Sequence, residues 1–191
     1  MLTFGLISAL LGGWMGLNQT QTRKLMAFSS IAHMGWLVVA LTISPNLSTV
    51  ALLVYFIMTS ATLMILALTQ GKTMLDLSTT HAYYPTLMML LMLSTMSLGG
   101  LPPLSGFFPK WLILKELARL EMPLLATIMA LSTLPSLYFY IRMTYITMLT
   151  SPPNTTPTKH NWRLHEDPPT HITTLVSLAL LLMPLTPTLL S

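Results

Sequence analysis

The chain lacks cysteine and has few charged residues. Of its 191 residues, 7% are charged and 53% are hydrophobic. A soluble globular domain carries about 25% charged residues, so this composition excludes a soluble enzyme. The lack of cysteine excludes disulfides, cysteine nucleophiles and iron–sulfur clusters held by thiolates of this chain.

Signals for nucleotide or nucleic-acid binding are also missing. No glycine-rich phosphate loop follows a strand-like run. The net charge of +4 comes from a few groups that lie between the apolar stretches. Charges so placed indicate membrane topology rather than a phosphate-binding patch. We therefore expect the lipid bilayer as a partner and no nucleic acid.

Long apolar stretches recur along the whole chain. Stretches of about 20 residues are long enough to cross a hydrocarbon core of about 30 Å. The sequence predicts an all-α membrane protein, a single transmembrane bundle over residues 1–191 with a polar loop at 151–170. About six transmembrane helices are expected, at 2–20, 25–43, 47–69, 86–119, 123–145 and 172–190.

The fourth predicted span is interrupted. As one straight helix, residues 86–119 would be about 50 Å long, too long for one crossing. Residues 99–106 contain three glycines and two adjacent prolines, which a helix does not continue through cleanly. We expect one crossing that is broken at 99–106 near mid-membrane. Broken spans line protein-buried or watery sites, and in transporters they mark the working site.

The basic residues support a single broken crossing. Under that topology they divide unequally, which the positive-inside rule favours. One side carries Arg23, Lys24, Lys72, Arg142, Lys159 and Arg163, and the other carries Lys115 and Arg119. Tyr138, Tyr140 and Tyr145 are expected in an interfacial aromatic belt, because tyrosine collects where lipid meets water.

Two ionisable residues are expected deep in the membrane, where such groups are costly and usually functional. Lys110 lies nine residues before Arg119, and His33 lies nine residues after Lys24. Nine helical residues span about 14 Å, close to half of the hydrocarbon core. Lys110 and His33 are therefore the candidate catalytic residues, as members of a proton relay.

Simpler interpretations remain open for these charged residues. Lys110 could extend its long side chain to an interface. His33 could be a neutral packing residue bonded to Ser29 or Ser30 on the same helix face. Four charged residues that follow Lys110 are more typical of a solvated helix end than of a relay, namely Lys115, Glu116, Arg119 and Glu121.

Three sequence stretches resemble a known family. They are GGWMGLNQTQTRKLMAFSSIAHMGW at 12–36, LGGLPPLSGFFPKW at 98–111 and LYFYIR at 137–142. The first is similar to the signature of the antiporter-like membrane subunits of respiratory complex I. Its end, at 29–35, is shared with multisubunit sodium/proton antiporters. The other two resemble the chain 2 family of mitochondrial NADH-ubiquinone oxidoreductase.

The resemblance implies a function. It implies a core membrane subunit of complex I, multi-pass in the mitochondrial inner membrane, that couples NADH-to-ubiquinone electron transfer to proton translocation. Lys110 matches the lysine of the family's second broken helix, and His33 matches the histidine of its hydrophilic axis. No cofactor is expected on this chain. NADH, FMN, iron–sulfur clusters and ubiquinone would be handled by partner subunits, and its neighbours would be other antiporter-like subunits.

The resemblance covers only the C-terminal half of the family pattern. The family's first broken helix, with its central lysine and its glutamate–lysine pair, has no counterpart here, which predicts a partial sequence. Two alternatives remain at this point. One is a stand-alone cation/proton antiporter subunit, and the other is a structural membrane scaffold in which Lys110 and His33 only pack.

Overall fold

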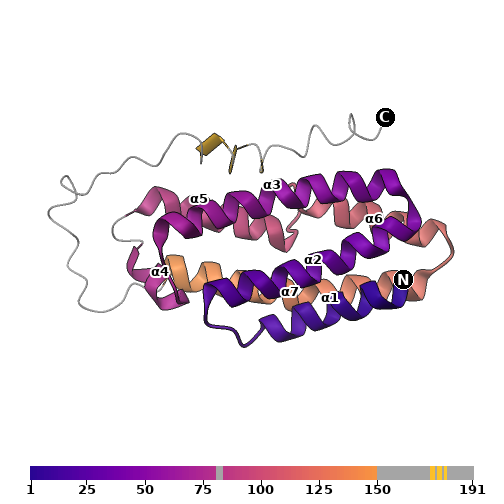
Figure 1. The fold of residues 1–191 in the computed structure, drawn as a ribbon, viewed down its shortest axis with the longest axis horizontal. Helices are drawn as coiled ribbons and strands as arrows, with labels where there is room; N and C mark the ends of the chain where they lie inside the picture. The colour runs from indigo at the N-terminus through magenta and orange to yellow at the C-terminus, as the bar shows by residue number, and fades with distance from the viewer. Residues whose placement is uncertain (81–83, 150–172, 175, 178, 180–191) are drawn as a thin grey trace, which may run out of the picture.

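The computed structural model describes residues 1–80 and 84–149, together with 173, 174, 176, 177 and 179. Within these residues the secondary structure is helical apart from one isolated bridge between Gln21 and Thr73. The helices are α1 (Leu2–Gly16), α2 (Thr22–Ile43), α3 (Pro45–Thr69), α4 (Met74–Thr80), α5 (Pro85–Gly99), α6 (Phe107–Arg119) and α7 (Pro123–Leu149) (Figure 1).

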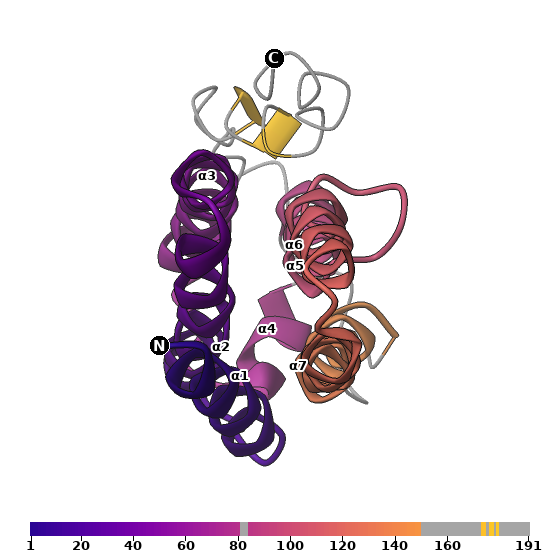
Figure 2. The same ribbon diagram turned by 90° about the vertical axis from the view of Figure 1, so that its right-hand side faces the viewer.

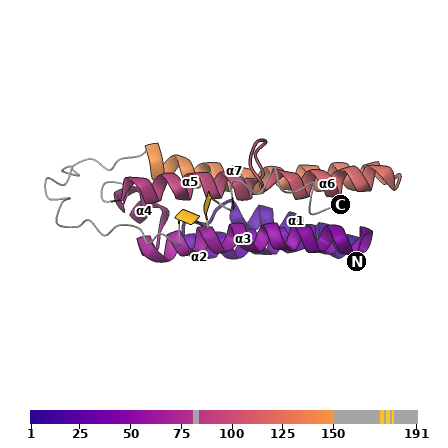
Figure 3. The ribbon, with the colours of Figure 1, turned by 90° about the horizontal axis from the view of Figure 1, so that it is seen from above.

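The long helices form two layers. One layer contains α1, α2 and α3 side by side, and the other contains α7 beside α5 and α6 (Figures 2 and 3). Helix α4 lies at one end of the bundle and contacts α7. Helices α5 and α6 follow each other along the length of the bundle (Figure 1).

Small residues let α1 approach α2 closely. A Cβ added to Gly12 would lie 2.5 Å from the backbone nitrogen of Ala32. One added to Gly35 would lie 2.6 Å from the carbonyl oxygen of Gly5 and from the hydroxyl of Ser8. Glycine at these positions therefore sets the spacing of the two helices, as small residues do in membrane bundles.

Local sequence signals account for several helix ends. Ser44 is extended and separates α2 from α3, which has Pro45 in its first turn. Proline suits this position because it lacks the N–H that a first turn leaves unpaired. Helix α3 ends at Thr69, and the next residue, Gln70, adopts a left-handed conformation with φ of 49°. Helix α7 continues through Pro135 to Leu149, beyond the predicted end at residue 145.

Other segments differ from the prediction or lie outside the described residues. Helix α1 ends at Gly16, four residues before the predicted boundary. Helix α4 occupies Met74–Thr80, between the predicted spans 47–69 and 86–119, where no helix was predicted. The predicted loop at 151–170 lies outside the described residues. So does most of the predicted span at 172–190, of which residues 173, 174, 176, 177 and 179 are described and helical.

Among the described residues, three helices have the length and hydropathy of membrane spans: Thr22–Ile43, Pro45–Thr69 and Pro123–Met148, with mean hydropathy of 1.7, 2.3 and 1.6. Helices α1 and α5 are apolar but shorter. Large apolar side chains lie on the outer surface, among them Phe4 at 72% exposure and Leu124 at 75%. An apolar exterior of this kind fits contact with lipid.

Candidate functional site

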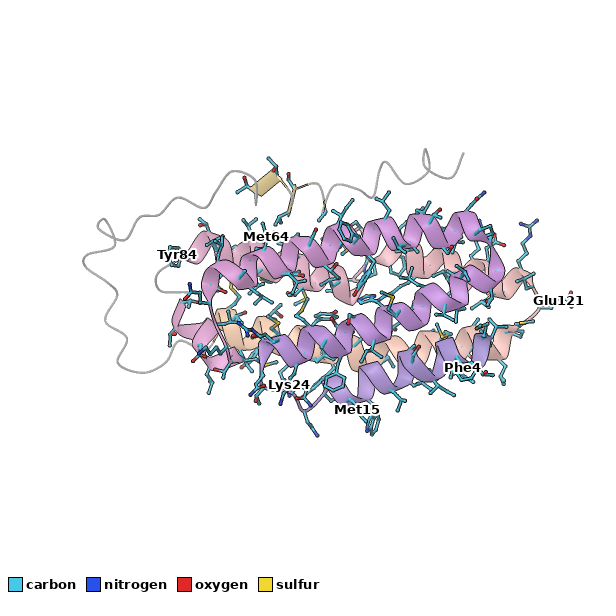
Figure 4. All side chains as sticks on the ribbon, in the orientation of Figure 1. Phe4, Met15, Lys24, Met64, Tyr84 and Glu121 are labelled. Atoms are coloured by element: carbon cyan, nitrogen blue, oxygen red, sulfur yellow. The ribbon has the colours of Figure 1, made fainter. Side chains whose placement is uncertain are left out.

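The site begins where the helix predicted at 86–119 is interrupted. Helix α5 ends at Gly99 and α6 begins at Phe107, so residues 100–106 form a turn. Gly100 has φ of +84°, the left-handed conformation in which glycine ends many helices. Tyr84, just before α5, and Glu121, just after α6, lie at opposite ends of the bundle (Figure 4).

The turn is packed tightly against α5. A Cβ added to Gly106 would lie 2.0 Å from the carbonyl oxygen of Ser97. The Ser97 and Ser105 hydroxyl oxygens are 3.2 Å apart, and Ser105 also donates to the carbonyl of Ala179. The turn is thus held in place by hydrogen bonds in the protein interior, where unpaired polar groups would be costly.

Lys110 of α6 reaches back across this turn. Its side chain is 9% exposed. Its Nζ donates to the carbonyl oxygens of Gly99, at 3.0 Å, and Leu98, at 3.4 Å. These carbonyls belong to the last turn of α5, the negative end of that helix dipole, so the position stabilises a positive charge. Lys110 therefore does not extend to the surface.

His33 and Lys110 line the same cavity. Its volume is about 40 Å³, and its walls come from α2, α3, α5 and α6. His33 of α2, Tyr55 of α3 and Lys110 of α6 contribute its polar side chains. A space of this size can hold about one water molecule. The structure thus brings together the two residues that the sequence singled out.

Two tyrosines contact His33. The Tyr140 hydroxyl of α7 lies 3.4 Å from His33 Nε2, a long hydrogen bond whose direction depends on the histidine tautomer. The Tyr55 ring of α3 packs against the His33 ring, with centroids 4.9 Å apart. His33 therefore connects both layers of the bundle. Neither contact is evident from the sequence, because the tyrosines lie on other helices.

The two serines expected to bond His33 have other partners. Ser29 donates to the carbonyl of Met26, and Ser30 donates to the carbonyl of Ala27, each at 2.7 Å. Serine commonly bonds back to its own helix in this way.

The prediction of an aromatic belt is wrong for one of its three tyrosines. Tyr140 is 1% exposed and lies in the core beside His33. Tyr138 and Tyr145 are 58% and 57% exposed, as a belt requires. Helical geometry explains the difference, because residues two apart on a helix face different sides.

Arg142 joins three segments at one end of the bundle. Its guanidinium donates to the carbonyls of Leu17, at 2.5 Å, and Gln19, which follow α1. It also lies 3.8 Å from the sulfur of Met74 in α4. Arg142 thus links α7 to both neighbours, a structural role that its place in the sequence does not reveal.

The charged residues near the end of α6 lie on the surface. Arg119 and Glu116 form a pair at 3.8 Å, with side chains 79% and 31% exposed. Lys115 Nζ lies 5.6 Å from the centre of the Trp111 ring. These contacts fit the expected solvated helix end.

Comparison with known families decides the family. Residues 1–135 match the family described as NADH:quinone oxidoreductase/Mrp antiporter, transmembrane. The chain belongs to this family. Residues 137–190 match a second family, described as the C-terminus of NADH dehydrogenase subunit 2.

Curated relatives agree with this assignment. The chain is 51% identical over 189 residues to NADH-ubiquinone oxidoreductase chain 2 of Varanus melinus, covering 98% of this chain and 55% of that protein. It is 50% identical over 182 residues to the chain 2 of Xenopus laevis, covering 95% and 52%. The chain therefore spans about half the length of the curated relatives it matches, and its sequence resemblance to chain 2 is confirmed.

Solved structures share the fold. A chain of respiratory complex I from Thermus thermophilus, with bound aureothin, matches with a TM-score of 0.74 at 24% identity, covering 96% of this chain and 44% of that one. A chain of the Mrp complex from Dietzia sp. matches with a TM-score of 0.79 at 18% identity, covering 99% and 45%. The helical arrangement is thus that of membrane subunits in both kinds of complex.

Proposed function

We propose that the chain is part of a proton-translocating core subunit of NADH:ubiquinone oxidoreductase in the mitochondrial inner membrane. The identity to chain 2 proteins and the family membership support this assignment. The subunit would take part in an H⁺-translocating oxidoreductase reaction without a redox site in this chain. NADH, FMN, iron–sulfur clusters and ubiquinone would be bound by partner subunits, and neighbouring antiporter-like subunits would flank it.

The topology that goes with this function has about six crossings, and α5 and α6 together make one of them. Tyr84 and Glu121 at opposite ends of the bundle support a single traverse (Figure 4). The turn at 100–106 would then lie within the membrane. Its internal hydrogen bonds make such a break tolerable, since lipid cannot satisfy exposed backbone groups.

The single observation that carries the mechanism is Lys110 at the helix break, sharing a cavity with His33. Burial opposes a charge on Lys110, while the carbonyls of Leu98 and Gly99 favour it. In this proposal, Lys110 takes up and releases a proton at the helix break. A water molecule in the cavity would carry a proton between His33 and Lys110, and release from Lys110 would complete the transfer.

Replacement of Lys110 by methionine tests this function. Lys110→Met keeps the length of the side chain but removes its proton. In the full-length subunit of the assembled complex, we expect coupled turnover to fall at least about tenfold, or the proton-to-electron ratio to fall, while assembly survives. The measurements are NADH oxidation and proton uptake in proteoliposomes.

The control is Lys115→Met, which makes the same change at an exposed position on the same helix. It should leave turnover and the proton-to-electron ratio unchanged. Normal values of both in Lys110→Met would contradict the relay and favour a structural scaffold.

A stand-alone cation/proton antiporter is the second candidate, because the matched family includes Mrp antiporters. That function predicts sodium-dependent proton flux in vesicles that contain the full-length subunit but no NADH-oxidising partner. The high identity to chain 2 proteins favours the oxidoreductase instead.

A further inference from the structure

The helix break contains a second group of buried polar side chains, apart from Lys110 and His33. Ser97 of α5, Ser105 of the turn and Met58 of α3 are all buried. The two serine hydroxyl oxygens are 3.2 Å apart, and the sulfur of Met58 lies 3.9 Å from Ser97 Oγ and 3.8 Å from Ser105 Oγ. The proposed proton transfer does not use these groups, so their close association needs another explanation.

The hydrogen bonds of the two serines have a direction. A serine hydroxyl has one proton to donate. Ser105 donates it to the carbonyl oxygen of Ala179, which is a stronger acceptor than a thioether sulfur. In the contact between the two serines, Ser97 is therefore the donor and Ser105 the acceptor. The chain of hydrogen bonds runs from α5 through the turn to Ala179 in the C-terminal segment.

This chain of hydrogen bonds joins the two arms of the break that carry the Lys110 site. Ser97 directly precedes the two residues of α5 whose carbonyls accept from Lys110 Nζ. Ser105 lies just before α6, the helix that carries Lys110. The separation of the two arms therefore sets the distance from Nζ to its acceptors. A charge-assisted hydrogen bond depends strongly on this geometry.

The two arms have little room to approach each other. A Cβ added to Gly106 would lie 2.0 Å from the carbonyl oxygen of Ser97 and 2.9 Å from the Cε of Met58. Close packing therefore limits closure of the break, while the hydrogen bond from Ser97 to Ser105 limits its opening. Together they define one separation of the arms.

Met58 connects the two serines with the cavity. Its sulfur contacts both serine hydroxyls, and its side chain also lines the cavity with His33 and Lys110. A displacement of the serines would therefore move one wall of the space in which His33 and Lys110 lie.

We propose that Ser105 is a positioning residue for proton transfer at Lys110 and that it ties the opening of the helix break to the C-terminal segment. Its hydroxyl holds the turn between Ser97 and the Ala179 carbonyl, which fixes where Nζ meets the carbonyls of α5. Ser105 itself does not exchange the transferred proton. The C-terminal segment thus supplies one fixed end of the Lys110 site. This proposal rests on the proposed function of Lys110.

Ser105→Ala tests this role, because it removes both hydrogen bonds with little change in volume. With the full-length subunit, we expect coupled turnover per assembled complex to fall about three- to tenfold. The deuterium solvent isotope effect should rise, because proton transfer limits the rate more when Nζ is misplaced. A purely structural role would lower the yield of assembled complex and leave both values unchanged, and that result would overturn the proposal.

The control is Ser94→Ala, which makes the same change at another buried serine of α5. The Ser94 hydroxyl donates to the carbonyl of Leu91 in its own helix, so this variant should match the wild type. An equal loss of turnover in both variants would contradict a specific role of Ser105.

The direction of the hydrogen bonds predicts an order of effects. Ser97→Ala leaves the bond from Ser105 to Ala179 in place, so it should lower turnover less than Ser105→Ala. The double variant should behave like Ser105→Ala alone, because both changes break the same chain. Additive losses would contradict a shared chain. If Ser105→Ala prevents assembly, normal turnover and isotope effect in Ser97→Ala would overturn the proposal.

The outcomes separate this proposal from the one it rests on. If Lys110→Met lowers turnover but Ser105→Ala leaves turnover and isotope effect unchanged, the positioning role is wrong and the relay at Lys110 stands. If Lys110→Met has no effect, the proposed function itself fails.

Discussion

Gly100 illustrates how one residue position supports the site. Its φ of +84° closes the end of α5, and the Lys110 side chain passes directly over it. A Cβ at this position would lie 3.0 Å from Lys110 Nζ and 3.2 Å from its Cδ. The same glycine therefore ends the helix and leaves room for the ammonium group at the exposed carbonyls.

Gly100→Ala should damage the site in two ways. The left-handed conformation costs a residue with a Cβ about 1 kcal/mol, and the methyl group would displace Nζ from its carbonyl partners. We expect lower thermal stability of the subunit and lower coupled turnover of the complex. Gly99→Ala is the control, because its Cβ would have Tyr140 as its nearest neighbour at 3.6 Å, an ordinary contact. Equal behaviour of the two variants would contradict this account.

Helix α4 is short and is stabilised by hydrogen bonds at its N-terminus. The Thr73 backbone N–H donates to Asp76 Oδ2 at 2.9 Å, and the Asp76 backbone N–H donates to Thr73 Oγ1 at 3.2 Å. This reciprocal pair is a capping box. The Thr22 hydroxyl on α2 also donates to the carbonyl of Gly71 at 2.9 Å, which holds the preceding turn.

The capping box predicts a pH dependence outside the membrane. Hydrogen bonds from the Thr73 backbone and side chain hold the pKa of Asp76 below its usual value. A lowered pKa in the folded state means that the carboxylate stabilises the cap above the usual aspartate pKa. That stabilisation is lost as pH falls through the lowered pKa. Hydrogen exchange of the α4 peptide, corrected for intrinsic rates, should accelerate in that acidic range.

Asp76→Asn is the matched variant for this measurement. An amide does not titrate, so the pH-dependent part of the exchange should disappear. Persistence of the same acceleration in the variant would assign it to another group.

At the element level, sequence reasoning succeeded where apolar runs and glycine–proline punctuation are strong. The interruption between α5 and α6 follows from the three glycines and two prolines among the eight residues 99–106. Helix α4 was missed because it is short and polar. Its capping residues, Thr73 and Asp76, are of types that are also common in loops. Tyr140 was misplaced because periodicity alone does not identify which face of α7 is buried.

At the scale of the whole molecule, Arg142 ties α7 to the other layer. It bonds the carbonyls after α1 and contacts Met74 of α4, while its Nε is buried without a partner among the described residues. The sequence placed Arg142 only on the more basic side of the membrane. Only the assembled bundle shows that carbonyls more than a hundred residues away are its partners, which is why sequence could not identify this link.

Arg142→Met should loosen the contact between the layers at this end. Loss of hydrogen bonds from a charged donor costs about 2 kcal/mol, so we expect a lower thermal unfolding temperature for the subunit in the detergent-solubilised complex. Arg142→Lys should restore little, because an ammonium cannot reproduce the planar fork of a guanidinium. Arg119→Met, at a side chain 79% exposed, should have no effect. Full recovery with lysine would contradict a geometric role.

Two hollow spaces lie along α2 and α3, and their different walls have a mechanical consequence. One is a groove of about 790 Å³ and the other is the inner cavity lined by His33 and Lys110. The outer groove is bounded by α2, α3 and the turn after α3, all on one side of the bundle, whereas the inner cavity also has walls from α5 and α6. Sliding one layer past the other would therefore reshape the space around Lys110 and leave the groove as it is. Parting α2 from α3 would widen both. The two motions would therefore differ in effect, because only separation of α2 from α3 would also change the groove.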